Sequence, residues 1–600
     1  MKLHFMGIGG VGMAALAVLA KARGDDVSGC DVGCGARTAW LGSEGIKVFT
    51  GHDSAHLKGV DEVIVTPAVN VENPELKYAK NLGIRVRYRG ELLAELASAR
   101  DTIAVCGSHG KTTTSTFIAK LLTALGEDTA WAIGGETGVM PVARAGNGPL
   151  VVEADESDGT LALYHAKTLV VNKCEYDHPD YFKSEADYFA CFEKAKANAD
   201  DVIDAQELDL SGWNLPVAGA HNKRNARAAI EVALRRGYDR AAIEAVLPGV
   251  LAELPDRRFE LLAPGVYTDY AHHPTEMKNA IQMAREVCRG KLRVLFQPHR
   301  YSRTKALIND FPSAFADADE TIICPTYAAF ESPVEGGDEA DLYAACRAAG
   351  INVYLSRSCE EAWTHAKLSS AKDDVVLLLG AGDIIALSPM VREGRVAQER
   401  RIYLGMGTNT WRSDLQCNEV YVKTEGPAGR PGAELGIPWM AGIPGTVGGW
   451  VKMNAGAFGH SISELILKVK VDGEWRDAAE CGFGYRKSTI DGEIQDVILK
   501  PYARDLTAAQ EFMARRAKFP PGTRGSVFKN PEGDFAGRLL EAAGAKELRV
   551  GGAYVWENHA NVIVEGEGSR ACDFLALARL MRQRVKLRLG VDLQPEVCGI

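Results

Sequence analysis

Between Gly107 and Thr112 the chain combines glycine, lysine and threonine at a spacing that can hold phosphate groups. Glycines at 107 and 110 let backbone N–H groups approach phosphate oxygens, Lys111 can reach the β- and γ-phosphates of a nucleotide, and Thr112 can bind Mg²⁺ through its hydroxyl. The common P-loop spacing requires a glycine where this chain has Val105, so the segment indicates a shorter variant. A glycine-rich turn that only caps a helix is the alternative, and the Lys-Thr pair directly after the last glycine favours nucleotide binding.

A second glycine-rich turn lies near the N-terminus. It contains Gly7, Gly9, Gly10 and Gly12. The spacing fits a dinucleotide fingerprint, and Asp31 stands where a ribose-binding acid belongs. The pattern itself indicates only a diphosphate at a helix N-terminus, which UDP-sugars also carry. An NAD-dependent oxidoreductase is the alternative, but residues 1–390 show no constellation for hydride transfer.

Two side chains are candidates for binding a divalent cation beside Thr112. Glu153 ends an apolar strand pattern, and His178 follows the next one. Mg²⁺ prefers oxygen ligands, so Glu153 suits it, whereas His178 is unexpected from ligand preference alone and fits a structural histidine equally well. The neighbouring Asp155, Glu156 and Asp158 form either a solvated acidic turn or part of a metal or substrate site.

Alternating strand and helix patterns must position these residues. Such alternation predicts a parallel α/β domain to about residue 97, a second α/β unit that opens at the phosphate loop, and a third that begins near Leu254 and closes with the strand Val375–Asp383. The segment 391–401 is predicted to be a charged helical connector. Beyond it, glycine- and aromatic-rich loops between short strands predict an α+β region.

Composition narrows the class of protein. The length of 600 residues predicts about four domains. A net charge of -10 argues against nucleic acid as the main partner and favours small ligands. The 13 scattered cysteines indicate a reduced, cytoplasmic setting. No segment has the apolar length of a membrane helix, and the glycines of the first turn interrupt what could otherwise be taken for a signal peptide.

Residues 1 to about 390 resemble the Mur ligases, and specifically the UDP-N-acetylmuramate:L-alanine ligases. The motifs that carry the resemblance are GIGGVGMAALA, GSHGKTTT, EADESDG, EYDH, AGAHNKRNA, DYAHHPTE and FQPHRYSRT, in the family's order. The resemblance implies a UDP-substrate domain over residues 1–97, a central ATPase domain over 98–253 and a Rossmann-like C-terminal domain over 254–390. It also implies a cytoplasmic role in peptidoglycan synthesis, with ATP and Mg²⁺.

The same resemblance assigns roles to individual residues. ATP would be bound by Gly107, Ser108, His109, Gly110, Lys111, Thr112, Thr113, His221, Asn222 and Asn225, with Lys111 catalytic, and Mg²⁺ by Thr112, Glu153 and His178. The UDP-sugar and the ligation site would involve Gly7, Gly9, Gly10, Gly12, Asp269, Tyr270, His272, His299, Arg300 and Arg303. Ser108 replaces the family's usual threonine, and the stretch between Lys194 and His221 is short for the family.

Residues 402–600 resemble the UDP-N-acetylenolpyruvoylglucosamine reductases. The motifs are LGMGTN, AGIPGTVGGW, MNAGAFG, FGYRKS, GSVFKNP, ENHANVIV and LQPEV. The resemblance implies a shortened FAD-binding region over 402–502, a substrate region over 503–600, and NADPH as reductant. FAD would contact Gly405, Gly407, Thr408, Asn409, Gly442, Ile443, Pro444, Gly445, Gly448 and Gly449; substrate would contact Tyr485, Lys518 and Asn530; Arg486, Ser526 and Glu596 would be catalytic.

These resemblances predict a fused bifunctional enzyme. The C-terminal part would reduce UDP-N-acetylglucosamine enolpyruvate to UDP-N-acetylmuramate, and the N-terminal part would join L-alanine to that product. The family's portion ahead of LGMGTN is missing, and Thr408 stands where serine is usual. The alternative is therefore an active ligase that carries a flavin-free binding or scaffold module.

Overall fold

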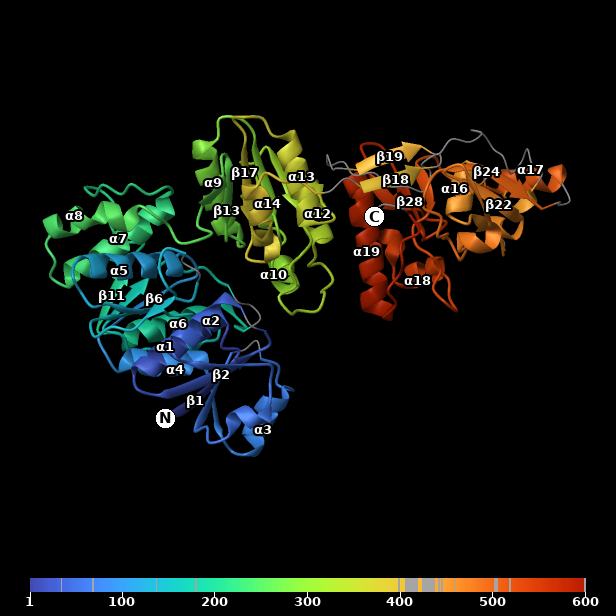
Figure 1. Cartoon of the computed structure of the whole chain (residues 1–600). Coiled ribbons are helices and arrows are strands. Elements are labelled where there is room, and N and C mark those ends of the chain that lie inside the picture. Colours follow the sequence, from blue (N-terminus) through green and yellow to red (C-terminus); the bar gives the residue numbers. More distant parts are fainter. Residues whose placement is uncertain are drawn as a thin grey trace. The chain divides into compact units, whose positions relative to one another are not determined.

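This computed structural model describes residues 1–397, 400–404, 419–423, 437–440, 443, 446–457, 459–500, 505–516 and 519–597, apart from positions 34, 67, 68, 136, 137 and 178–180. The chain forms two compact units (Figure 1). The first comprises Met1–Glu260 with Thr268–Tyr270, and the second Leu261–Tyr267 with Ala271–Ile600. None of the helices in the described parts of the chain combines the length and apolar character needed to cross a bilayer.

The first unit begins with a five-stranded parallel sheet in the order β3-β2-β1-β4-β5. Its strands are β1 (Lys2–Met6), β2 (Asp26–Asp31), β3 (Lys47–Thr50), β4 (Glu62–Val65) and β5 (Arg85–Tyr88). Its helices are α1 (Val11–Ala22), α2 (Ala36–Ser43), the short 3₁₀ helix η1 (Ser54–Leu57), α3 (Pro74–Asn81) and α4 (Arg89–Ser98). The central strands β1 and β4 are almost fully buried, as expected where helices cover both faces of a parallel sheet.

A second, six-stranded sheet follows in the order β11-β10-β6-β9-β7-β8, in which only the β7–β8 pair is antiparallel. The strands are β6 (Thr102–Cys106), β7 (Ala130–Ala132), β8 (Ala143–Arg144), β9 (Leu150–Glu153), β10 (Thr168–Val171) and β11 (Asp201–Asp204). The helices are α5 (Lys111–Ala124), η2 (Thr160–Leu163), α6 (Glu185–Asn198), α7 (Ala220–Arg235) and α8 (Arg240–Leu251).

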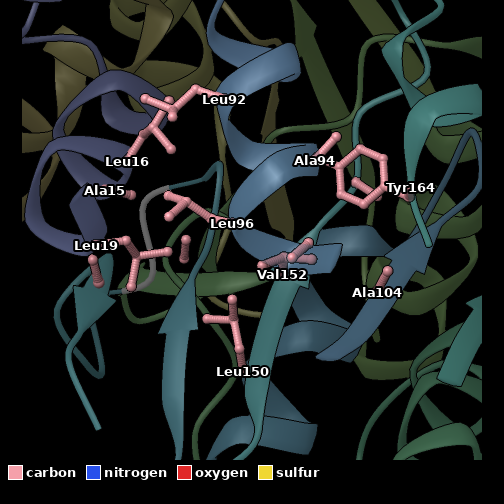
Figure 2. Packing of buried hydrophobic residues seen from close by; sticks show 14 of the residues in the cluster. Ala15, Leu16, Leu19, Leu92, Ala94, Leu96, Ala104, Leu150, Val152 and Tyr164 are labelled. Atoms are coloured by element: carbon pink, nitrogen blue, oxygen red, sulfur yellow. The ribbon is translucent and has the colours of Figure 1, made fainter. Parts of the chain in front are cut away.

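One hydrophobic core joins these two sheets. Figure 2 shows Leu16 on α1 and Leu92 on α4 in the same cluster as Leu150 and Val152 on β9. Tyr164, which is 2% exposed, belongs to it as well. Burial of large apolar side chains contributes about 1.5–3 kcal/mol each, so the shared core accounts for the packing of both sheets in one unit.

A third sheet, most of which belongs to the second unit, has the order β12-β13-β17-β14-β15-β16. Its strands are β12 (Glu260–Ala263), β13 (Val266–Asp269), β14 (Leu292–Phe296), β15 (Glu320–Ile323), β16 (Val353–Leu355) and β17 (Val375–Leu379). Its helices are α9 (Pro274–Val287), α10 (Tyr301–Ala306), α11 (Phe311–Ala314), α12 (Glu339–Ala348), α13 (Cys359–Ser369), η3 (Asp383–Leu387) and α14 (Ser388–Arg392).

The predicted helical connector over residues 391–401 is wrong. Helix α14 ends at Arg392, and Gly394 has a φ of 64°, a left-handed conformation that stops the helix. The next residues lie along α13: Trp363 Nε1 donates to the Arg395 carbonyl at 2.7 Å, and the Ala397 N–H donates to Thr364 Oγ1 at 3.0 Å. A strand, β18 (Arg400–Leu404), follows and pairs with β19 (Glu419–Lys423).

The rest of the second unit is built from small antiparallel sheets, as the α+β prediction requires. One sheet has the order β23-β22-β24, and another has the order β25-β28-β27-β26. Their strands are β22 (Ile466–Val471), β23 (Glu474–Asp477), β24 (Ile494–Leu499), β25 (Thr523–Ser526), β26 (Arg549–Val550), β27 (Ala553–Val555) and β28 (Val562–Glu565). The remaining elements are η4 (Pro438–Met440), α16 (Val447–Lys452), β20 (Gly456–Ala457), β21 (His460–Ser461), η5 (Ile462–Glu464), η6 (Ala478–Cys481), α17 (Leu506–Arg516), α18 (Ala536–Ala542), η7 (Ala545–Glu547) and α19 (Ala571–Leu589).

Within this unit, α19 packs beside α12 of the third sheet (Figure 1). The wholly buried Asp573 of α19 accepts hydrogen bonds from Tyr343 Oη at 2.7 Å and Arg347 Nε at 3.1 Å, both on α12. Arg579 of α19 forms an ion pair with Glu339 at 3.0 Å. The C-terminal helix is therefore fixed to the third sheet by buried polar contacts.

Candidate functional site

The predicted phosphate loop lies between strand β6 and helix α5. Gly107 and Gly110 have φ angles of 125° and 82°, which L-residues with a Cβ rarely adopt. A Cβ at 107 would lie 2.9 Å from the Asn172 Cβ, and one at 110 would lie 2.7 Å from Asn225 Oδ1. The loop therefore requires glycine at both positions. Because α5 starts at Lys111, its first backbone N–H groups face the loop.

Lys111 is held at the base of this loop by two partners. Its ammonium group donates to the Gly107 carbonyl at 2.7 Å and to both carboxylate oxygens of Glu156, at 2.8 and 2.9 Å. Burial alone would lower the pKa of Lys111, but Glu156 and Asp155 raise it above its ordinary value, so the side chain stays charged. Burial raises the pKa of Glu156 to about 7 despite that lysine.

Thr112 and Glu153 bring oxygen atoms together beside the loop. Thr112 Oγ1 lies 3.1 and 3.0 Å from the two carboxylate oxygens of Glu153, and the Gly134 N–H donates to the same carboxylate at 2.9 Å. Burial raises the pKa of Glu153 above its ordinary value. A hydroxyl and a buried carboxylate are ligands that Mg²⁺ accepts, so these residues fit the ion. His178, the other predicted ligand, lies outside the described residues.

Helix α7 places predicted adenosine contacts against the loop, and it runs beside α5 (Figure 1). Asn222 and Asn225 are buried in its first turns, and Asn222 Nδ2 donates to the Ala218 carbonyl at 3.0 Å. His221 lies half-buried on the same turn. Sequence analysis missed Asn172, whose amide donates to Thr114 Oγ1 at 3.1 Å beneath the loop.

The other predicted ATP contacts have structural partners in the loop. Ser108 Oγ donates to the Glu175 carbonyl at 2.6 Å and accepts from the Glu175 N–H at 2.8 Å. A hydroxyl is all that these contacts need, which explains why serine can replace threonine. His109 Nε2 lies 2.9 Å from Glu175 Oε2, and Thr113 is buried on α5.

The N-terminal glycine turn follows strand β1. Gly7 has a φ of 78°, and its N–H donates to the Cys30 carbonyl at 2.8 Å. Asp31 does not stand free for a ribose, because its carboxylate accepts from the Gly9 N–H at 2.8 Å and so holds the turn. Gly10 caps helix α1, which leaves the helix N-terminus open toward a diphosphate.

Arg89, at the start of α4, links the glycine turn to the acidic residues near the phosphate loop, and sequence analysis missed it. A Cβ at Gly12 would lie 2.9 Å from the Arg89 guanidinium, and that guanidinium donates to Asp155 at 2.5 Å. Asp155 precedes Glu156, the partner of Lys111. Only the fold brings α4 beside this loop, so no local sequence signal could have identified the contact.

Asp269 and Tyr270 belong to the first unit, beside a strained segment. Asp269 accepts from the Phe259 N–H at 2.8 Å, and the Tyr270 ring lies under the Arg257 guanidinium at 4.7 Å. Arg257 and Phe259 have φ angles of 56° and 55°, rare for residues with side chains. Such strain often marks functional segments, and no sequence pattern indicated it.

The predicted basic residues of the second unit gather at the end of strand β14. The rings of His272 and His299 lie 5.6 Å apart. Arg300 has a φ of 69°, and its N–H donates to the Tyr327 carbonyl at 2.9 Å. Arg303 lies half-buried on α10.

Two of the three predicted reductase residues are in direct contact, in the part of the second unit after residue 437. Arg486 Nε donates to Glu596 Oε1 at 2.9 Å, and Arg486 Nη2 donates to the Gly456 carbonyl at 2.7 Å. The Glu596 N–H donates to the Val527 carbonyl at 2.7 Å, and Ser526 directly precedes that residue. Burial raises the pKa of Glu596 against the effect of Arg486. Arg486 itself has a left-handed φ of 54°.

Most of the predicted flavin contacts lie outside the described residues. They are Gly405, Gly407, Thr408, Asn409, Gly442, Pro444 and Gly445, together with the substrate residue Lys518. Ile443 is half-buried, and Gly448 and Gly449 lie on α16. Tyr485 is 54% exposed beside Arg486, and Asn530 accepts from the Ala536 N–H at 3.0 Å.

Three family descriptions match the sequence. They are the Mur ligase family, catalytic domain, over residues 2–101; the Mur ligase, glutamate ligase domain, over 257–382; and the UDP-N-acetylenolpyruvoylglucosamine reductase, C-terminal domain, over 517–600. The third match confirms the predicted relation to this reductase family.

Curated relatives and a solved structure match the N-terminal two thirds. The UDP-N-acetylmuramate–L-alanine ligase from Kineococcus radiotolerans is 37% identical, and the match covers 65% of this chain and 95% of the relative. The enzyme of the same name from Acidobacterium capsulatum is 34% identical, and the match covers 65% of this chain and 97% of the relative. The alanine ligase MurC structure from Thermotoga maritima is 29% identical, with a TM-score of 0.55 over 66% of this chain and 98% of its own. This likeness confirms the predicted three-domain fold. The chain therefore belongs to the Mur ligase family, and its ligase domains are followed by the C-terminal domain of a UDP-N-acetylenolpyruvoylglucosamine reductase.

Proposed function

We propose that residues 1–390 join L-alanine to UDP-N-acetylmuramate and convert ATP to ADP and phosphate. The names of the relatives supply the substrates, and the Lys111 loop is the observation that supports the chemistry. A carboxylate is a poor acyl donor, so phosphoryl transfer from ATP would first give an acyl phosphate. The amine then attacks its carbonyl carbon, and phosphate leaves.

The described residues supply charge and position for these steps. Lys111 would neutralise charge on the transferred phosphoryl group, and the N–H groups at the start of α5 would hold the phosphates. Thr112 and Glu153 would hold Mg²⁺, which supplies further neutralisation when bound. Arg89 would position the UDP-sugar against the glycine turn, since its guanidinium lies beside Gly12.

The test is release of ADP that requires both UDP-N-acetylmuramate and L-alanine. Lys111→Ala should lower kcat/KM by a factor of roughly 100 to 1,000, as the loss of one preorganised charge contact does elsewhere. Lys196→Ala is the matched control, because that lysine pairs only with Glu193 on the surface among the contacts seen. ADP release without the amino acid, or full activity in Lys111→Ala, would contradict the proposal.

We further propose that residues 402–600 reduce UDP-N-acetylglucosamine enolpyruvate with NADPH and FAD. The Arg486–Glu596 pair beside Ser526 supports this assignment. Bound FAD would supply the hydride. Arg486 would stabilise the negative charge that hydride addition creates next to the carboxylate, and the Ser526 hydroxyl would deliver the proton to carbon.

Flavin content and the Ser526→Ala variant test the second activity. The purified chain should bind FAD in equal molar amount, and NADPH should bleach the flavin equally fast in wild type and variant. Reoxidation by the enolpyruvyl substrate should slow by about 10²–10⁴-fold in the variant only. Equal slowing of both steps would remove Ser526 as the donor. A chain that takes up no FAD from excess would instead be a ligase with a flavin-free binding module.

A further inference from the structure

A cluster of side chains that can bind a metal lies between the first sheet, helix α3 and the 3₁₀ helix η1. Glu75 on α3 is wholly buried, and around its carboxylate stand His4 on β1, Cys30 on β2 and His56 on η1. One ligand atom from each of these four residues lies within 4.8 Å of the other three. Four separate elements thus send nitrogen, sulfur and oxygen donors to one point.

Three distances from the Glu75 carboxylate to the other ligand atoms are slightly shorter than the edges of a small coordination polyhedron. His4 Nε2 and His56 Nδ1 each lie 3.1 Å from Glu75 Oε1, and Cys30 Sγ lies 3.1 Å from Oε2. Metal–nitrogen and metal–sulfur bonds of about 2.0–2.3 Å in a tetrahedron place neighbouring ligand atoms about 3.3–3.5 Å apart. Only small shifts would therefore admit a cation.

The ring of His4 directs its Nε2 atom to this point. Its Nδ1 lies 2.9 Å from Ser28 Oγ, and that hydroxyl donates onward to the Leu3 carbonyl at 3.5 Å. When the Nδ1 proton is directed to Ser28, the neutral imidazole offers the Nε2 lone pair to a cation. Nε2 is fully buried, and although it lies 3.1 Å from Glu75 it makes no hydrogen bond of acceptable geometry. In that tautomer, Nε2 and the carboxylate oxygen can both bind a cation placed between them.

His52 and Phe49 hold the cluster from outside. His52 Nδ1 lies 3.0 Å from Glu75 Oε2, which orients the carboxylate. The Phe49 ring stacks on His56 at 4.2 Å between centroids and fixes its plane. The surroundings are apolar, since Met6, Leu57, Val63, Val65, Leu76 and Ala79 are all buried in the same cluster of side chains.

Charge and donor type select the ion. A divalent cation with one thiolate and one carboxylate has no net charge, which suits an apolar pocket where an isolated charge is costly. Two imidazoles, a thiolate and a carboxylate are a zinc-type donor set, whereas Mg²⁺ and Ca²⁺ prefer oxygen alone. Binding would release the thiol proton of Cys30 to solvent as the zinc–sulfur bond forms.

We propose that His4, Cys30, His56 and Glu75 form a structural zinc site that ties β1, β2, η1 and α3 together. The Cys30 carbonyl accepts from the N–H groups of Gly7 and Ile8, at 2.8 and 3.1 Å. The site therefore also anchors the first residues of the glycine turn. This inference does not depend on the ligase or reductase activity.

Metal content of the full-length chain, prepared without a histidine tag, tests the site. After zinc is added in the presence of excess Mg²⁺ and the protein is gel-filtered, wild type should retain one zinc ion per chain. Cys30→Ser and His56→Gln should retain at least tenfold less. Cys288→Ser, which changes a half-buried cysteine of the second unit, should retain as much as wild type.

Cobalt distinguishes this site from adventitious binding and needs no variant. Co²⁺ bound to wild type should give a thiolate-to-metal charge-transfer band in the near ultraviolet and the strong visible bands of tetrahedral coordination, and zinc should remove both. Zinc should also raise the melting temperature of wild type and Cys288→Ser but not of Cys30→Ser. Wild type without retained zinc, cobalt without a thiolate band, or equal zinc in Cys30→Ser would each overturn the proposal.

Discussion

At the scale of single residues, the phosphate loop contains an ion pair between Lys111 and the buried carboxylate of Glu156. The Lys111 side chain is 14% exposed, and its partner Glu156 is wholly buried. Removing one member of such a pair leaves the other charge without compensation, which is far more costly than losing the attraction alone. Substitutions here therefore act on folding as well as on catalysis.

We expect Glu156 to give local stability an unusual pH dependence. Its pKa is raised from 4.5 to about 7, so its protonated form favours the folded state. This contribution is complete below the unfolded pKa and is lost as pH rises through about 7. As the pH rises from about 4.5 to about 7, the stability of wild type relative to Glu156→Gln should thus decrease by at most about 3 kcal/mol. Hydrogen exchange of β6 and α5 at about pH 5 and about pH 8 measures it. A constant difference between the two proteins would contradict the assigned shift.

Glu153 should control the need for Mg²⁺. In Glu153→Gln the amide is a weaker ligand than the carboxylate, so the Mg²⁺ concentration for half-maximal ADP release should rise by roughly tenfold or more. His178→Ala should raise it less, because nitrogen is the poorer ligand for this ion. Glu193→Gln, on the exposed surface of α6, is the control. Unshifted titrations in both variants would leave Glu153 with a structural or substrate role.

The sequence predicted the residues of the loop because their spacing is local. Gly107, Gly110 and Lys111 follow one another in a single turn, and their chemistry depends only on that turn. The cluster around Glu75 could not be predicted in this way, since His4 and Glu75 are separated by most of the first sheet. His4 and Glu75 come into contact only because of the order in which the strands pair and the position of α3 on the sheet.

At the scale of elements, the alternation of strand and helix was enough to predict the parallel sheets. The connector over residues 391–401 was predicted wrongly because its charged pattern suits a helix. In the structure Gly394 ends α14, and the Trp363 side chain donates a hydrogen bond to the backbone just beyond it. Contacts between elements were also beyond prediction. Helix α4 matters for the site only because its first residue, Arg89, reaches both the glycine turn and Asp155.

We expect Arg89 to govern binding of the UDP-sugar. Arg89→Lys keeps the charge but loses the planar fork that can reach two partners at once, so KM for UDP-N-acetylmuramate should rise about tenfold while kcat changes less. Asp155→Asn should give a smaller effect, and the double variant should be less impaired than the two effects combined, because the residues interact. Arg85→Lys, on the exposed end of β5, serves as control. A change confined to KM for ATP would refute this role.

At the scale of the whole molecule, the reductase-type domain and most of the third ligase sheet lie in one compact unit. Their contact is polar and buried. Asp573 accepts hydrogen bonds from Tyr343 and Arg347 of α12, and the N–H of Arg570, just before α19, donates to the same carboxylate at 2.9 Å. The reductase-type part follows the ligase part in the chain, although the reaction proposed for it would come first. Chain order itself therefore provides no argument for transfer of product between the two.

Asp573 should therefore be critical for the stability of the second unit. Asp573→Ala would leave the partly buried Arg347 and the wholly buried Tyr343 hydroxyl without this partner. Breaking a buried pair of this kind typically costs about 3–5 kcal/mol of stability. We expect a lower urea midpoint for this unit, followed by tryptophan fluorescence, together with faster hydrogen exchange in both α12 and α19. Asp592→Asn, which removes an exposed partner of Arg582 near the end of α19, should cost less than about 1 kcal/mol. If Asp573→Ala loosened α19 while α12 kept wild-type protection, the two parts would fold independently, and the fusion would be a tether rather than one cooperative structure.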